Sequence, residues 1–428
     1  MIQTIRKAWA IPELRKKIIF TALILLIFRI GNAIPVPYVD TGLLKDYIDQ
    51  LSTTVLGLYN VMSGGAFAEA TVFALGVQPY INSSIIIQLL TIAIPALERM
   101  ARDGGEEGKK KIQSITRYAT VAIAILQGWG YYMLMKNYNI LGDHTGVWPA
   151  LVIIASFIAG SSFVMWMGEQ ITEFGIGNGI SIILFAGILS RVPSMVSSMI
   201  SGIQAGTLAW WAAVLVVVGM LALIVLITWV NGAERRIPVQ YAKRVVGRKM
   251  YGGQASYIPI KVNMSGVMPI IFASTLCGLP NMIGSFLNLD ATKHPYWTAF
   301  FRVFNYNSVL YLVVYVLLIV AFNYFYVAIQ YNPVDISNQL RKNNGTIPGI
   351  RPGKPTSDFI TKTLSKITLI GAVFLAIVAA VPMIIGDLTG VSIQLGGTSL
   401  LIIVGVALDT ARSLEGYMTA RHHKGFLE

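Results

Sequence analysis

Residues that could carry chemistry are few in this chain, and their spacing matches no familiar reaction centre. The four histidines include one adjacent pair, His422 and His423, and none of them lies beside the only cysteine, Cys277. No set of His and Cys residues has the spacing of a metal site, and no nucleophile is paired with a base. We therefore expect neither an enzyme nor a bound metal or cofactor.

Two glycine-rich stretches fit no nucleotide-binding loop. Residues 104–110 read G-G-E-E-G-K-K, which has the wrong spacing for a Walker A loop and no Ser or Thr after the lysine. Residues 175–179 read G-I-G-N-G, but Ile182 stands where a dinucleotide-binding loop needs its third glycine. If the protein does work that consumes energy, another subunit must supply that energy.

The stretch from Ile81 to Gln88 combines aliphatic and small polar side chains. In a helix, Ile81, Ile85 and Gln88 lie on one face. Such a face can serve helix packing, where small residues allow close approach. It can also form a narrow aliphatic constriction that excludes water and ions. On the residues alone, packing is the favoured interpretation.

The elements that must position these residues are membrane-spanning helices. Of the 428 residues, 55% are hydrophobic and 12% are charged, with a mean hydropathy of +0.64. A soluble protein carries roughly 25% charged residues. A spanning helix needs about 20 mostly apolar residues, and the first such stretch has no cleavage pattern, so we expect it to be retained. The ten expected spans are residues 18–34, 75–96, 115–136, 148–168, 179–201, 209–231, 264–286, 308–331, 364–386 and 396–416.

The basic residues are distributed unevenly around these spans. Most of the 33 Lys and Arg residues lie in the N-terminal segment, after spans two, six and eight, and in the C-terminal tail. A Lys/Arg excess marks cytoplasmic segments, so we expect both termini in the cytoplasm. This bias also accounts for most of the net charge of +13 without nucleic-acid binding. The opposite side carries only Lys45, Lys136, Arg191, Lys293 and Arg302.

Two basic loops, residues 232–263 and 332–362, are longer than topology alone requires. Long basic loops can bind an anionic partner, such as a protein or a structured RNA. We favour this interpretation over plain connecting loops.

A short internal repeat divides the chain into two halves. Residues 76–81 read G-V-Q-P-Y-I and residues 266–271 read G-V-M-P-I-I, near the starts of spans two and seven. Five spans per half would invert the second half relative to the first. Inverted repeats are common in solute transporters, but those need ionisable residues within the spans, and these span centres almost lack them. In a protein of this plan, a transport path would lie between the halves, and spans two and seven would line it.

Between the first two spans lies a short apolar stretch, residues 58–70, which Gly64 and Gly65 interrupt. Irregular backbone at membrane depth is tolerated only where protein buries it or where it lines a cavity. It is either a re-entrant segment that fills an internal void or a short interfacial helix.

Several motifs follow one another along the chain in a specific order. They are Phe28 to Gly31 with Ile34 to Pro37 and Asp40; Ser63 to Ala66 with Phe73 to Ile81; Glu173 to Ser181; Asn332 and Pro333 with Asn338 to Lys342 and Pro348 to Gly353; and Gly396 to Ile402. In these motifs the chain resembles the SecY family over its whole length. The resemblance implies an all-α fold, with ten transmembrane helices in two inverted five-helix halves around a central pore.

The family's hourglass channel has a waist through which unfolded secretory proteins would pass. Its halves would be residues 1–201 and 202–428, hinged between spans five and six, and nascent membrane helices would leave between spans two and seven. The resemblance places an aliphatic ring at the waist, in which Leu184 occupies a position that is often isoleucine. Together with the repeat, this outweighs the packing interpretation. The ring residues are Ile81, Ile85, Leu184, Ile271 and Ile402.

Two further sets of residues follow from the resemblance. A plug of about residues 59–70 would close the channel, with Tyr59, Asn60, Met62, Ser63, Gly64, Gly65 and Phe67. A lateral gate between the halves would set Ser83, Ser84 and Gln88 opposite Ser274 and Thr275, with Gln127 nearby.

The resemblance also implies partners and a location. The SecA ATPase and the ribosome would bind the basic loops, and Arg351 matches the arginine that couples the family to SecA. The binding residues would be Arg235, Arg236, Lys243, Arg244, Arg248, Lys249, Arg341, Lys342 and Arg351. SecE and SecG would be companion subunits, and signal peptides and nascent chains the substrates. The protein would lie among the lipids of the inner (cytoplasmic) membrane.

Overall fold

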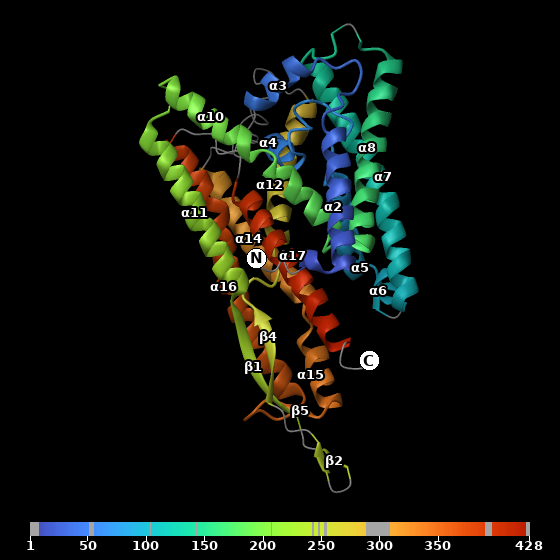
Figure 1. The fold of residues 1–428 in the computed structure, drawn as a ribbon, viewed down its shortest axis with the longest axis vertical. Coiled ribbons are helices and arrows are strands. Elements are labelled where there is room, and N and C mark those ends of the chain that lie inside the picture. The colour runs from blue at the N-terminus through green and yellow to red at the C-terminus, as the bar shows by residue number, and fades with distance from the viewer. Residues whose placement is uncertain are drawn as a thin grey trace.

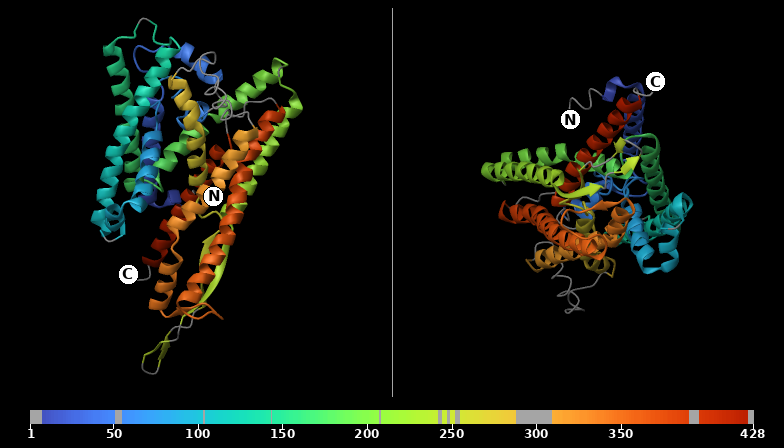
Figure 2. Two further views of the ribbon diagram at one scale, coloured as in Figure 1. Left: turned by 180° about the vertical axis from the view of Figure 1, so that it is seen from behind. Right: turned by 90° about the horizontal axis from the view of Figure 1, so that it is seen from below.

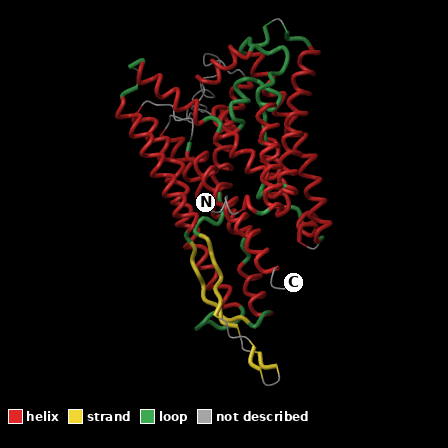
Figure 3. Tube along the Cα trace, in the orientation of Figure 1, coloured by secondary structure: helices red, strands yellow, loops and turns green. Residues whose placement is uncertain are grey.

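The computed structural model describes residues 8–50, 55–102, 104–142, 144–206, 208–241, 244–246, 249–251, 255–287, 309–389 and 396–424. Long helices run roughly side by side, and a projection that contains the strands extends from one end (Figures 1 and 3). The view from below in Figure 2 shows the helices grouped around the middle of the molecule.

In the part that the structure describes, the first half of the chain forms six long or paired helices and three short ones. Apolar runs form them, and a proline in the first turn, where no amide donor is needed, begins α2, α5 and α10. They are α2 (Pro12–Gly31), α5 (Gln78–Ala93), α7 (Gly105–Asn137), α8 (Val147–Phe174), α9 (Gly179–Leu189) and α10 (Val192–Gln204), with α3 (Thr41–Gln50), α4 (Val55–Met62) and α6 (Pro95–Arg102) between them.

Within its described residues, the second half forms five long helices and one short helix. They are α11 (Trp210–Gly232), α12 (Met268–Leu287), α14 (Val309–Gln330), α16 (Lys354–Thr389) and α17 (Gly397–Lys424), with α15 (Pro333–Lys342) before α16. Helix α12 packs against α14, and α14 packs against α16.

Each of the ten expected spans contains a helix in the described residues. Among the residues that the structure describes, six helical stretches are long and apolar enough to cross a membrane by length and composition, and α5 with α6 makes a seventh, bent by 106°. The bend lies at Ile94, whose backbone is extended because Pro95 follows it. Helix α7 begins at Gly105, before its expected span, because the charged residues that precede the apolar stretch are also helical.

The repeat motif has the same backbone form in both halves. Gly76 and Gly266 both adopt a positive φ, 52° and 63°, which favours glycine. Helices α5 and α12 then begin at matching repeat positions, Gln78 and Met268. In Figure 1, α5 runs down toward α6, whereas α12 runs upward from the β4 side, so the two helices run in opposite directions. This is the arrangement expected of an inverted repeat.

The two long basic loops are folded together, which the sequence analysis did not anticipate. Strands β1 (Glu234–Tyr241) and β4 (Ala255–Lys261) pair antiparallel, and β5 (Gly345–Thr346) from the other loop pairs with β1. Two short strands, β2 (Arg244–Val246) and β3 (Lys249–Tyr251), form a hairpin at the tip. Ile237 and Val239 point inward on alternate positions of β1 and join one apolar core with α15 and α16.

Candidate functional site

A cavity of about 700 Å³ lies between the two halves, and Pro259 and Lys261 of β4 in the projection help to line it. Residues of α5, α7, α8 and α9 line it on one side, and residues of α11, α12, α14 and α17 on the other. Much of its wall is polar or charged, with Gln113, Glu169, Thr172, Asn178, Asn231, Lys261, Gln330, Asp409 and Arg412. Such side chains can form hydrogen bonds with water or with a polar occupant of the cavity.

The five predicted ring residues come together. They lie on α5, α9, α12 and α17, are between 4% and 8% exposed, and belong to one apolar cluster. Four of them, Ile81, Leu184, Ile271 and Ile402, also line the cavity, while Ile85 packs in the same cluster. Four helices from two halves thus bring aliphatic side chains to one place, as an apolar constriction requires.

The predicted plug segment is compact and packs against this cluster. The Oδ1 atom of Asn60 accepts a hydrogen bond from the amide of Ala68 at 3.0 Å. The hydroxyl of Ser63 donates to the carbonyl of Asn60 and accepts from the amide of Phe67, both at 3.1 Å. Asn60, Met62 and Ser63 are nearly fully buried. This burial favours a re-entrant segment that fills internal space over a helix at the membrane surface.

The plug lies on the side of the ring away from α6. The Nε2 atom of Gln78, at the start of α5, is 2.8 Å from the sulfur of Met62. The cavity is lined by residues farther along α5, from Tyr80 to Gln88. Val61 and Met62 belong to the same apolar cluster as the ring. Along α5, the contact with the plug at Gln78 therefore comes before the ring residues, and the cavity lining extends past them to Gln88.

Ser83, one of the predicted gate residues, is hydrogen-bonded within its own half. Its hydroxyl lies 2.6 Å from that of Thr120 on α7 and also donates to the carbonyl of Tyr80 at 2.9 Å. Ser83 is completely buried, so it joins α5 to α7 within one half. The hydroxyl of Ser274 donates to the carbonyl of Ile271 in its own helix, at 2.9 Å.

The other predicted gate residues lie in different places: at the cavity, on α12 and on α7. Ser84 and Gln88 line the cavity, and Thr275 is half-buried on α12. Helix α12 packs against α7, the helix that carries Gln127, whose Oε1 atom is buried with no hydrogen-bond partner in the described part of the chain. The contact between the halves on this side is therefore between α7 and α12, next to α5.

The predicted partner-binding residues lie on the projection. The guanidinium of Arg236 is hydrogen-bonded to Glu234 at 2.7 Å and lies over the ring of Tyr257 at 4.7 Å. The bond to Glu234 raises the pKa of Arg236, so this guanidinium stays charged. Arg235 is exposed on the same strand. Arg244 and Lys249 lie in the tip hairpin, whereas Lys243 and Arg248 lie outside the described residues.

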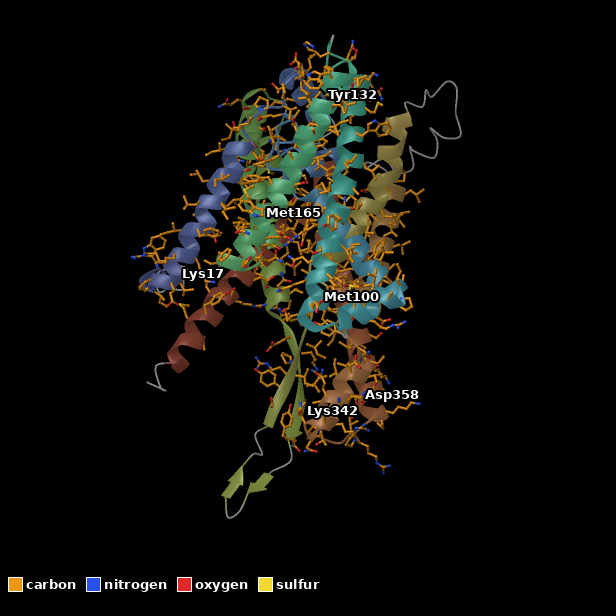
Figure 4. All side chains as sticks on the ribbon, turned by 90° about the vertical axis from the view of Figure 1, so that its right-hand side faces the viewer. Lys17, Met100, Tyr132, Met165, Lys342 and Asp358 are labelled. Atoms are coloured by element: carbon orange, nitrogen blue, oxygen red, sulfur yellow. The ribbon has the colours of Figure 1, made fainter. Side chains whose placement is uncertain are left out.

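Arg351 is exposed in a turn whose backbone is well held. Thr356 donates a hydrogen bond to the Arg351 carbonyl at 2.8 Å, and Ser337 on α15 donates to the carbonyl of Gly353 at 2.9 Å. Arg341 and Lys342 are exposed at the end of α15. In Figure 4, Lys342 and Asp358 lie on the projection, at the opposite end of the molecule from Tyr132. The projection thus presents cations on a rigid support.

Comparisons with known proteins point to one family. The family model described as SecY matches residues 71–411. A relative from Streptomyces scabiei, named protein translocase subunit SecY, is 40% identical over the full length of both chains. One of the same name from Thermotoga maritima is 41% identical over 100% of this chain and 98% of its own. The chain belongs to the SecY family.

Solved structures of SecY and Sec61 channels share the fold. One, described as a protein-conducting channel, superposes with a TM-score of 0.63 at 16% identity, over 94% of this chain and 91% of its own. Sec61 in a canine ribosome–channel complex superposes with a TM-score of 0.59 at 15% identity, with the same coverage. As a member of this family, the chain is a multi-pass membrane protein with the predicted fold, a channel subunit and not an enzyme.

One polar cluster on the cavity wall was missed by the sequence analysis. The Nε atom of Arg117 on α7 lies 2.8 Å from Glu169 on α8, and Gln113 donates to the same carboxylate at 3.2 Å. The carboxylate is only 15% exposed, so the pair joins α7 and α8 beside the path. Glu169, near the end of an apolar run, was a signal for it, because a charge at that place needs a partner.

Proposed function

We propose that this chain conducts unfolded secretory polypeptides across the cytoplasmic membrane and releases hydrophobic segments sideways into the lipid between α5 and α12. The observation that carries this proposal is the meeting of Ile81, Leu184, Ile271 and Ile402 at one end of a polar cavity. These side chains come from both halves, so a small separation of the halves would open a path.

An aliphatic narrowing suits a polypeptide better than a small solute. It offers no hydrogen bond that would hold one particular sequence, so many sequences can slide through. A hydrated ion would have to lose water there, which is unfavourable. A solute transporter would instead need a specific polar site at the narrowest point. A scaffold without a through-path would need neither the ring nor the plug.

Direction and energy would come from partners. We propose that SecA or a ribosome docks on the basic projection and feeds the chain into the cavity, since no nucleotide-binding loop is visible in the sequence. The docking residues would include Arg235, Arg341 and Arg351. Among solved structures of the same fold are Sec61 in a ribosome–channel complex and a yeast Ssh1 complex bound to an 80S ribosome. SecE and SecG would complete the membrane complex.

The same proposal fixes the orientation. The projection and both termini would face the cytoplasm, in keeping with the Lys/Arg bias. The halves would be residues 1–201 and 202–428, and they would part about the connection between α10 and α11. Signal peptides would bind where the halves part, and the surrounding membrane lipids would receive released helices.

Transport in proteoliposomes tests this function. The purified chain, reconstituted with SecE, SecG and SecA, should make a radiolabelled secretory precursor resistant to added protease when ATP is present. Vesicles that lack the chain are the control. A precursor that remains fully protease-sensitive with the intact complex would refute the proposal.

A further inference from the structure

The plug is attached to the two halves of the channel in different ways. Within the described residues, its hydrogen bonds lead to the N-terminal half. Asn32 at the end of α2 donates to the carbonyl of Ser63 at 3.0 Å. Gln78 on α5 reaches the sulfur of Met62, and the hydroxyl of Tyr131 on α7 donates to the carbonyl of Phe67.

Among the described residues, the contacts given for the plug with the C-terminal half are apolar. Helix α4 packs against α12, and Val61 and Met62 share one cluster with Ile271 and Ile402. Apolar contacts are non-directional and can slide, whereas buried hydrogen bonds fix a position and are costly to break. When the halves separate, the plug should therefore lose its apolar contacts with the C-terminal half before its hydrogen bonds to the N-terminal half.

Helix α9 approaches the backbone of the plug closely near the C-terminal end of the helix. A Cβ atom added at Gly187 would lie 2.7 Å from the carbonyl oxygen of Met62, so only glycine allows this approach. Gly64 has a φ of 73° and comes close to the backbone of Gly187. The hydroxyl of Ser190 donates to the carbonyl of Gly187 at 2.6 Å and thereby faces the same turn.

Arg191 covers the next residue of the turn. Gly65 has a φ of 94°, and a Cβ atom there would lie 3.1 Å from Nη1 and 3.7 Å from Cδ of Arg191. The arginine side chain is half-buried and extends across the glycine. The Gly64–Gly65 turn is thus held between a helix backbone and an arginine side chain.

We infer that the α9–α10 junction is a latch for the plug, in which Gly187 shapes the seat and Arg191 is a positioning residue that holds the Gly64–Gly65 turn. The latch keeps the plug with the N-terminal half when the halves begin to part, and its release is a separate step. This inference rests on the proposed function, because it assigns a role to the plug of a conducting channel.

Two variants test the latch in the complete complex. Arg191→Ala removes the covering side chain, with Lys136→Ala on α7 as its control, since that exposed lysine also carries a positive charge. Gly187→Ala places a methyl group against the plug backbone. Its control is Gly128→Ala on α7, where the nearest atom would be 3.7 Å away, an ordinary contact.

The first measurement is the ion conductance of the resting channel in planar bilayers. The second is the rate at which a membrane-impermeant maleimide labels the Met62→Cys variant. Every chain in this measurement also carries Cys277→Ser, which removes the buried native cysteine. We expect both latch variants to raise conductance and labelling rate about fivefold, the effect of ~1 kcal/mol on an equilibrium, while both controls match the parent.

If Arg191→Ala leaves both quantities unchanged, the latch is refuted, even if Gly187→Ala fails to fold. Precursor transport by the parent channel is measured in the same preparation. A parent that transports no precursor refutes the proposed function, whereas an active parent with an unaffected Arg191→Ala variant refutes only the latch.

Discussion

The side chains of Ile81, Leu184, Ile271 and Ile402 neither donate nor accept hydrogen bonds. Water held between them would lose bonds that it makes in bulk, so a narrow ring of such residues tends to stay dry. Their burial beneath the plug, at 4% to 8% exposure, is consistent with a closed state. A ring that opens by separation of the halves needs no titratable or metal-binding group.

Serine at ring positions should make the resting channel leak. We expect the combined replacement of Ile81, Ile85 and Ile271 by serine to raise resting ion conductance in planar bilayers by about tenfold, because hydroxyl groups hold water in the narrowing. Leu221→Ser on the exposed surface of α11 is the control. Equal conductance in the ring variant and the control would contradict the assigned ring.

At the residue scale, the ring was easier to predict than the gate. The repeat and the family resemblance both place Ile81 and Ile271 in matching positions, and aliphatic residues tolerate small rotations of a helix. The partner of Ser83 depends on the rotation of α5 about its axis, where neighbouring residues point about 100° apart. Apolar runs do not fix that rotation, so the bond to Thr120 could not be predicted.

Among the elements, the start of α12 is held by a buried polar network. Asn323 on α14 is bonded through its side chain to the hydroxyl of Ser265 and donates to the carbonyl of Thr368 on α16 at 2.8 Å. Since α12 carries Ile271, this network fixes part of the ring to the C-terminal half.

Loss of this network should destabilise the C-terminal half. We expect Asn323→Ala to lower the free energy of unfolding in detergent by about 1–2 kcal/mol, because two buried hydrogen bonds are lost. Thermal unfolding monitored by circular dichroism measures the change. Asn338→Ala, on the exposed face of α15, should leave it unaltered, and equal stability of the two variants would argue against the network.

The projection is the part of the chain to which the energy-supplying partner should bind. We expect Arg351→Glu to abolish SecA-driven precursor transport in proteoliposomes, because a carboxylate would repel an acidic surface that the guanidinium attracts. Insertion of the chain into the membrane should be unaffected, since Arg351 is exposed and only its carbonyl is bonded within the turn.

Lys354→Glu, at an exposed neighbouring position, changes charge equally and is the control. Transport by Arg351→Glu at the rate of the parent would remove Arg351 from the docking site.

For the whole molecule, the order of the spans was easier to predict from the sequence than the structure of the loops. Apolar runs and charge bias predict spans, and each expected span contains a helix. The pairing of β1 with β5 could not be predicted, because β5 lies far along the chain and is only two residues long. Strands this short carry too little alternation to be recognised.

The most direct measurement of the central claim is where a passing polypeptide touches the channel. A secretory chain stalled in transit, with one cysteine in its middle, would be tested for disulfide formation with single cysteines at positions 81 and 271, in a chain with Cys277 replaced by serine. Position 221 on the exposed surface of α11 is the control. The account predicts strong crosslinks at 81 and 271 and none at 221. Crosslinks at 221 alone, or at none of the three positions while the chain is stalled, would contradict it.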